Sequence, residues 1–175
     1  MKSKSDGRSL MEYVKRLEKE GIGLSGAIIV LQLDRNRYVI SFEGETARLL
    51  DGNTLKKEIP LIYEVFAHRK DISTVMRTCP RFCIEAAKRG RDIPPVLDDM
   101  AQIVGPKARV RDESDSAKII GVLKRNNACL IKAREAAVSC AIAVGRTPEQ
   151  AFAATLILEK SAQAYIEGMC IGGAK

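Results

Sequence analysis

The pattern of apolar and polar positions in the first forty residues predicts one helix followed by a β-hairpin. Ser9 and Glu12 have the spacing of a capping box, in which each side chain satisfies a backbone donor of the other residue. Apolar residues then follow at helical spacing until Gly21. Residues 27–33 and 38–42 are β-prone runs on either side of a polar break, which indicates two paired strands.

The middle of the chain alternates short helical and strand patterns. Glycine, proline and polar residues separate them, with turn signals at 51–53. Residues 136–144 form an apolar run that is long for a buried strand and short for a helix, so both assignments stay open. The other predicted elements are helices at 60–68, 78–90, 94–105 and 114–123 and strands at 72–76, 107–110 and 128–131.

The clearest local motif begins the last helix. Thr147 is expected to cap it, Pro148 fits the first helical position, and Gln150 is placed to reach back to the cap. The alternation of strands and helices predicts an α/β domain whose helices cover a sheet. We expect one domain over residues 9–167, with loose segments at 1–8 and 168–175.

Composition narrows the class of protein. Hydrophobic residues make up 46% of the 175 positions, which excludes a disordered or low-complexity chain. The net charge of +7 weakly favours anionic ligands, but aromatic residues are scarce and the basic residues are scattered, which argues against nucleic acid as the main ligand. The chain has neither an apolar run of membrane-spanning length nor a secretory signal, so we expect a cytoplasmic location.

The cysteine and histidine counts restrict the chemistry. Five cysteines in a cytoplasmic chain argue against a disulfide framework. The single histidine, His68, means that one chain cannot supply three imidazole ligands to a catalytic metal.

Short segments of the sequence recur in a fixed order at residues 24–27, 41–44, 58–62, 75–80, 93–102, 127–132 and 145–151, the last with a continuation at 158–160. Taken together, in this order and spacing, they resemble the class II aldolase and adducin family. The resemblance implies a three-layer α/β/α fold around a central mixed or antiparallel sheet. It also implies a zinc-dependent enzyme of carbohydrate metabolism, often a tetramer with its site between subunits, in which zinc polarises a carbonyl and a glutamate moves protons.

The zinc ligands of that family do not carry over. Its His-x-His pair falls on Arg77 and Cys79, and its third histidine falls on Arg134 or, counted from the other side, near Ser139. An arginine is always charged and cannot bind a metal. The family's zinc is therefore not expected here, and we predict no cofactor and no metal ligands.

Other residues that the family uses for catalysis and substrate binding are partly present in this sequence. The acid/base glutamate falls on Glu58, and the two turns that would hold a substrate phosphate fall at Gly26 and Gly44. Glu43, beside Gly44, would repel a phosphate.

Each candidate residue also has an ordinary structural interpretation. Cys79, between two arginines at a predicted helix start, is either a reactive thiol or a packed core residue. Glu58 is either a proton-transfer group or a carboxylate at a helix N-terminus. Arg77 and Arg134 either clamp an anion or are solvated or ion-paired.

Three functions follow from these alternatives. We expect a non-catalytic member of the family with a degenerate metal site, which serves in assembly or in ligand binding. The first alternative is a divergent lyase or epimerase that acts on a small sugar or sugar phosphate through Glu58. The second is a binder of anionic metabolites through Arg77 and Arg134. A homo-oligomer, tetrameric by resemblance, is expected in each case.

Overall fold

The computed structural model describes residues 2–22, 26–42, 46–134 and 138–172. Within them, seven strands form one sheet in the order β3-β2-β1-β4-β7-β6-β5. Neighbouring strands are antiparallel except β5 and β6, which are parallel, so the sheet is mixed. The strands are β1 (Ile28–Asp34), β2 (Arg37–Phe42), β3 (Arg48–Asp51), β4 (Thr74–Thr78), β5 (Val110–Asp112), β6 (Ala128–Lys132) and β7 (Cys140–Gly145).

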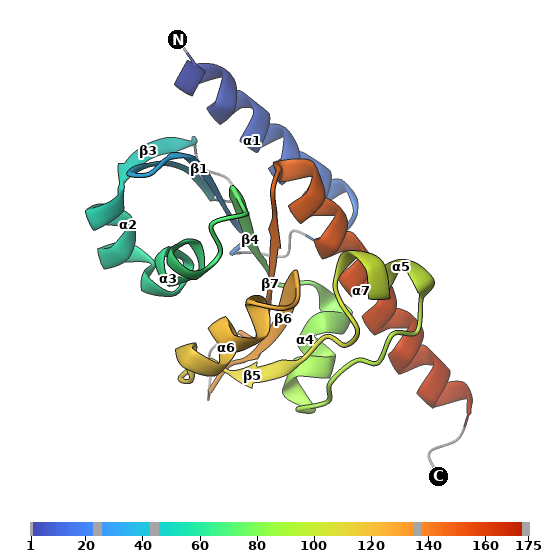
Figure 1. Cartoon of the computed structure of the whole chain (residues 1–175). Coiled ribbons are helices and arrows are strands. Elements are labelled where there is room, and N and C mark those ends of the chain that lie inside the picture. Colours follow the sequence, from blue (N-terminus) through green and yellow to red (C-terminus); the bar gives the residue numbers. More distant parts are fainter. Residues whose placement is uncertain (1, 23–25, 43–45, 135–137, 173–175) are drawn as a thin grey trace.

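Helices cover both faces of this sheet (Figure 1), which confirms the predicted α/β/α architecture. One face carries α2 (Gly52–Glu58), α3 (Pro60–His68) and α6 (Ser116–Leu123). The other carries α1 (Lys2–Lys19), α4 (Arg81–Lys88), α5 (Asp98–Ile103) and α7 (Pro148–Ile171).

The two-residue period of the strands divides the core between the faces. Ile28 and Val30 of β1 pack with α2 and α3, whereas Ile29 between them packs with α1 and α7. Where β7 meets the start of α7, a Cβ atom on Gly145 would clash with the backbone nitrogen of Ala151. Glycine at this position therefore allows the strand and the helix to approach closely.

One carboxylate from α7 fixes the start of α4. The N-cap of α4 is Pro80, which makes no side-chain cap hydrogen bond. Glu159 accepts hydrogen bonds from the backbone nitrogens of Phe82 and Cys83, each at 2.9 Å. A charged acceptor at a helix N-terminus satisfies orphan donors and complements the helix dipole. This contact holds the turn that follows β4, the strand that carries Arg77.

Several element boundaries differ from those expected. Helix α1 begins at Lys2, seven residues before the predicted cap at Ser9, and α7 continues to Ile171, beyond the expected end of the domain at 167. The turn at 51–53 is instead the start of α2, where Asp51 accepts from the backbone nitrogen of Thr54. The ambiguous run at 136–144 contributes β7. No helix in the described part of the chain is long and apolar enough to cross a membrane.

Candidate functional site

A pocket of about 330 Å³ brings together two residues that the sequence singled out, Glu58 and Arg77. It lies where the junction of α2 and α3 meets β4, β6, β7 and the start of α6. These segments are far apart in the sequence and meet only because the sheet places β4 beside β7. The other lining residues are Ile59, Pro60, Leu61, Ile62, Glu64, Glu113, Ser116, Ile131, Cys140 and Ile142.

Arg77 is the fixed positive charge of this pocket. It is half-buried on β4, and its Nε donates to the Cys140 sulfur at 3.3 Å. Burial alone would lower the pKa of the guanidinium, but Cys140, Cys79 and Glu113 outweigh burial and raise the pKa above its ordinary value. Arg77 therefore stays charged at any physiological pH.

Glu58 is already held by another cation. It is the last residue of α2, and Ile59 separates it from Pro60, the first residue of α3. Its carboxylate accepts from both terminal nitrogens of Arg48, at 2.6 and 3.4 Å. Glu58 thus lies at the C-terminus of α2 rather than in the first turn of α3. The negative end of the α2 dipole does not stabilise a carboxylate there, and Arg48 compensates its charge instead.

The cysteines near this region are buried. Cys79 is 5% exposed within the core beneath α3, the position that the packing alternative implies. Cys83 is completely buried, and burial raises the pKa of its thiol well above the ordinary value. Burial also raises the pKa of Cys140, although Arg77 opposes the effect. These environments favour neutral, unreactive thiols.

The remaining predicted residues do not join Arg77 in the pocket. Arg134 is exposed after β6 and is not among the lining residues. Gly26, with φ of +105°, lies exposed before β1 and is also outside the lining. Ser139, the other candidate for the third position, is buried and accepts from the backbone nitrogen of Ala133 at 3.1 Å. Gly44 and Glu43 lie outside the described residues.

The donor set does not fit the zinc ion that the resemblance implies. In the pocket, Glu58 is paired with Arg48, and Cys140 accepts from the cationic Arg77. Zinc prefers neutral imidazole or thiolate ligands, and a nearby guanidinium repels it. The described residues contain no cluster of three His, Cys, Asp or Glu side chains that could hold a metal ion.

Sequence reasoning missed Glu64, Glu113 and Cys140 as residues of this pocket. Glu113 follows a three-residue strand, and Cys140 lies in the apolar run that the pattern left ambiguous. Only the pairing of β7 with β4 places Cys140 beside Arg77, and no local motif marks such a contact.

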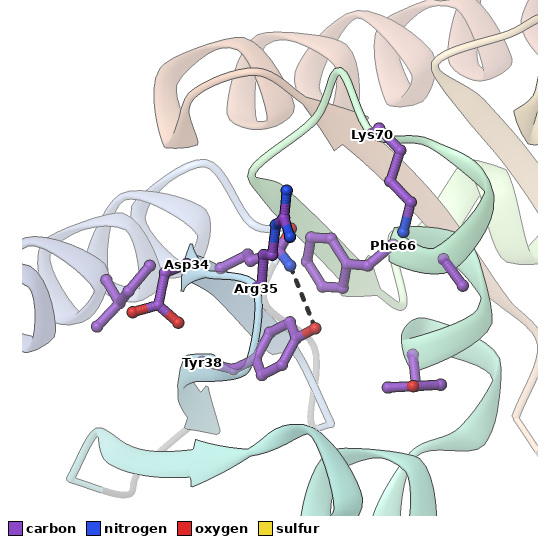
Figure 2. A pocket seen from close by; sticks show the side chains of 9 residues that line it. Asp34, Arg35, Tyr38, Phe66 and Lys70 are labelled. Atoms are coloured by element: carbon purple, nitrogen blue, oxygen red, sulfur yellow. Dashed lines mark hydrogen bonds between the residues drawn. The ribbon is translucent and has the colours of Figure 1, made fainter.

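A larger cavity, of about 730 Å³, lies at the other end of the β1–β2 hairpin from Gly26 (Figure 2). The rings of Tyr38 and Phe66, with centroids 5.4 Å apart, line it, and Arg35 and Lys70 lie on either side of Phe66. None of the residues predicted from the sequence lines this cavity. It is a separate hollow rather than part of the site around Arg77.

Comparison with solved structures identifies similar folds. The chain is similar to the L-fuculose-1-phosphate aldolase of Thermus thermophilus, with a TM-score of 0.75 and 15% identity over 94% of this chain and 95% of the other. A sugar-phosphate aldolase from Thermotoga maritima is also similar, with a TM-score of 0.70 and 11% identity over 100% of this chain and 99% of the other. The L-fuculose 1-phosphate aldolase of Glaciozyma antarctica has a TM-score of 0.71 and 13% identity over 92% of this chain and 72% of the other.

A search of curated protein sequences finds no significant match. The model of the class II aldolase and adducin N-terminal domain, in contrast, matches residues 25–166. That match covers most of the chain and all seven strands of the described sheet. The chain therefore belongs to the class II aldolase and adducin family.

Proposed function

We propose that this chain is a non-catalytic, ligand-binding member of the class II aldolase and adducin family, whose pocket beside Arg77 holds a small neutral polyhydroxy ligand. The observation that carries the proposal is the guanidinium of Arg77, which donates to Cys140 at 3.3 Å where the family resemblance expects a zinc ligand. A permanent cation at this point disfavours a bound divalent metal.

The charge of the pocket supports a neutral ligand. Glu58, Glu64 and Glu113 line it together with one arginine. Three carboxylates repel a phosphate, whereas carboxylates and a guanidinium both form hydrogen bonds with hydroxyl groups. Arg134 does not line the pocket, so the proposed two-arginine anion clamp lacks its second member there.

A divergent lyase or epimerase is the second candidate. The observation in its favour is that Glu58 lines the same pocket as Arg77, because a guanidinium can stabilise negative charge that develops on a substrate oxygen. The ion pair between Glu58 and Arg48 opposes it, since it would have to open before the carboxylate could accept a proton.

Assembly into a homo-oligomer, tetrameric by family resemblance, remains part of the proposal. Light scattering of the purified full chain tests it directly. A protein that stays monomeric at all concentrations would contradict the proposed oligomer. It would not affect the proposed ligand of the pocket, which the next experiment tests separately.

The ligand experiment compares L-fuculose with L-fuculose 1-phosphate by thermal shift. We expect the neutral sugar to raise the melting temperature and the phosphate to have little effect. Arg77→Met should abolish the shift, while Arg89→Met, at the exposed end of α4, should keep it. Stabilisation by the phosphate alone would contradict the neutral-ligand class.

Two further measurements test the absence of catalysis. Elemental analysis should find no stoichiometric zinc in the purified protein. An aldol-cleavage assay with L-fuculose 1-phosphate should show no turnover, and turnover that Glu58→Gln abolishes would establish the lyase alternative instead.

A further inference from the structure

Another concave surface, lined by basic residues, lies at the outer edge of the sheet. It is a groove of about 730 Å³ between β5, the last strand of the sheet, and α6 beside it (Figure 1). None of its lining residues is acidic, and it shares no lining residue with the pocket around Arg77. Its six cationic residues, which define the basic groove, are Lys107, Arg109, Arg111, Lys118, Lys124 and Arg125.

Only part of this charge is compensated within the protein. Arg109 lies 3.4 Å from Asp92, and Lys118 lies 2.8 Å from Asp115. Among the residues that the structure describes, the other four cations of the groove have no carboxylate within ion-pair distance. Four like charges on one concave surface repel one another, and this repulsion is relieved when an anion binds.

The two walls of the groove present their cations toward a shared space. Lys107, Arg109 and Arg111 alternate along an extended segment, so successive cations are separated by about 7 Å. The other wall offers Lys118 from α6, and Lys124 and Arg125 from the turn that follows the helix. Between these positions the helix carries Gly121, whose small size leaves the groove open.

We infer that the basic groove binds a ligand that carries two or more adjacent phosphate groups. Several cations spaced along two walls match a chain of negative charges better than a single carboxylate. No aromatic residue lines the groove, so it lacks a platform on which a nucleic-acid base could stack. Charged residues on an edge strand also discourage strand pairing between molecules, but this role does not account for the cations on α6.

The inference is independent of the function proposed for the pocket beside Arg77. Isothermal titration of the full chain with sodium tripolyphosphate, at about 0.15 M salt, tests it. We expect saturable binding of one tripolyphosphate per chain that weakens steeply as salt increases. Orthophosphate should bind at least about tenfold more weakly, and equal affinity for the two would overturn the requirement for adjacent phosphates.

A matched pair of variants locates the binding. Lys124→Gln with Arg125→Gln removes two cations at the end of α6, and Lys88→Gln with Arg89→Gln removes the same two residue types at the end of α4. We expect the first variant to weaken binding by about tenfold or more and the second by less than about twofold. Equal losses would show that only net charge matters and would overturn the site.

A single-stranded oligonucleotide provides the last comparison. If it binds more tightly than tripolyphosphate and loses affinity in the Lys124/Arg125 variant, the groove is a nucleic-acid backbone site and the small-ligand inference is wrong. Weaker oligonucleotide binding supports the inference.

Discussion

The pocket beside Arg77 and the basic groove use arginine in opposite ways. In the pocket, Arg77 is half-buried and donates to Cys140, and Glu58 is paired with Arg48. In the groove, Lys124 and other cations have no carboxylate partner among the described residues. A charged side chain that is packed and hydrogen-bonded within the fold contributes to its structure, whereas charges left uncompensated on a concave surface are available to a ligand. The difference predicts that replacing the half-buried Arg77 lowers the stability of the fold, whereas replacing an unpaired cation of the groove changes binding with little effect on stability.

The largest expected difference is in reactivity between the buried cysteines and the exposed Cys170. It tests how well the core beside the pocket excludes solvent and reagent. Cys79, Cys83, Cys129 and Cys140 are buried, and burial raises the pKa of Cys129 to about 12. Iodoacetamide at mildly alkaline pH should therefore modify one cysteine per folded chain, the exposed Cys170. Mass spectrometry counts the labels, and rapid native-state labelling of Cys79 would revive its interpretation as a reactive thiol.

The next contrast compares one cation from each region. Arg77→Ala should lower the free energy of unfolding by about 2 kcal/mol, because it removes a half-buried side chain and leaves its neighbours unpaired. Lys124→Ala should change it by less than about 0.5 kcal/mol. Urea denaturation measures both values, and similar losses in the two variants would remove the distinction between the regions.

A smaller effect, on the pH dependence of stability, is expected at Asp115, whose carboxylate pairs with Lys118 of the groove. Hydrogen bonds from the side chain and backbone nitrogen of Lys118 lower the pKa of Asp115. A lowered folded-state pKa stabilises the fold above the unfolded-state pKa, near 4, and this contribution is lost as the pH falls through the folded-state value. Asp115→Asn should therefore lose less stability than the wild type between about pH 5 and pH 2.

Thermal unfolding as a function of pH measures this difference. The asparagine keeps a capping side chain at the start of α6, so the fold should persist. Identical acid dependence in the two proteins would show that Asp115 does not interact with Lys118 in solution.

The smallest effect is expected at Glu58. Its pair with Arg48 is largely open to solvent, and such pairs contribute at most about 1 kcal/mol. Glu58→Gln should therefore leave the free energy of unfolding nearly unchanged. Denaturation of Glu58→Gln and of Arg48→Gln checks this, and a loss well above that limit in either would mean that the pair supports the pocket structurally.

Local motifs explain the parts of the fold that could be predicted. The hairpin of β1 and β2 and the proline-started α3 follow from runs of a few residues. Thr147 caps α7 by accepting from the backbone nitrogen of Gln150, as expected. The side chain of Gln150 accepts from the backbone nitrogen of Arg146 rather than from the cap, a difference of one residue. Family resemblance also supplied Glu58 and Arg77, which do meet in one pocket.

Only the tertiary structure decided which charges have partners. By itself, the sequence determined the helical and strand periods, the α/β class and the lack of three imidazoles, because these depend on local spacing and residue counts. It did not reveal that Cys140 lies against Arg77, that Arg48 holds Glu58, or that six apparently scattered cations line one groove. Those contacts join distant segments, and their positions depend on strand order and helix packing rather than on neighbours along the chain.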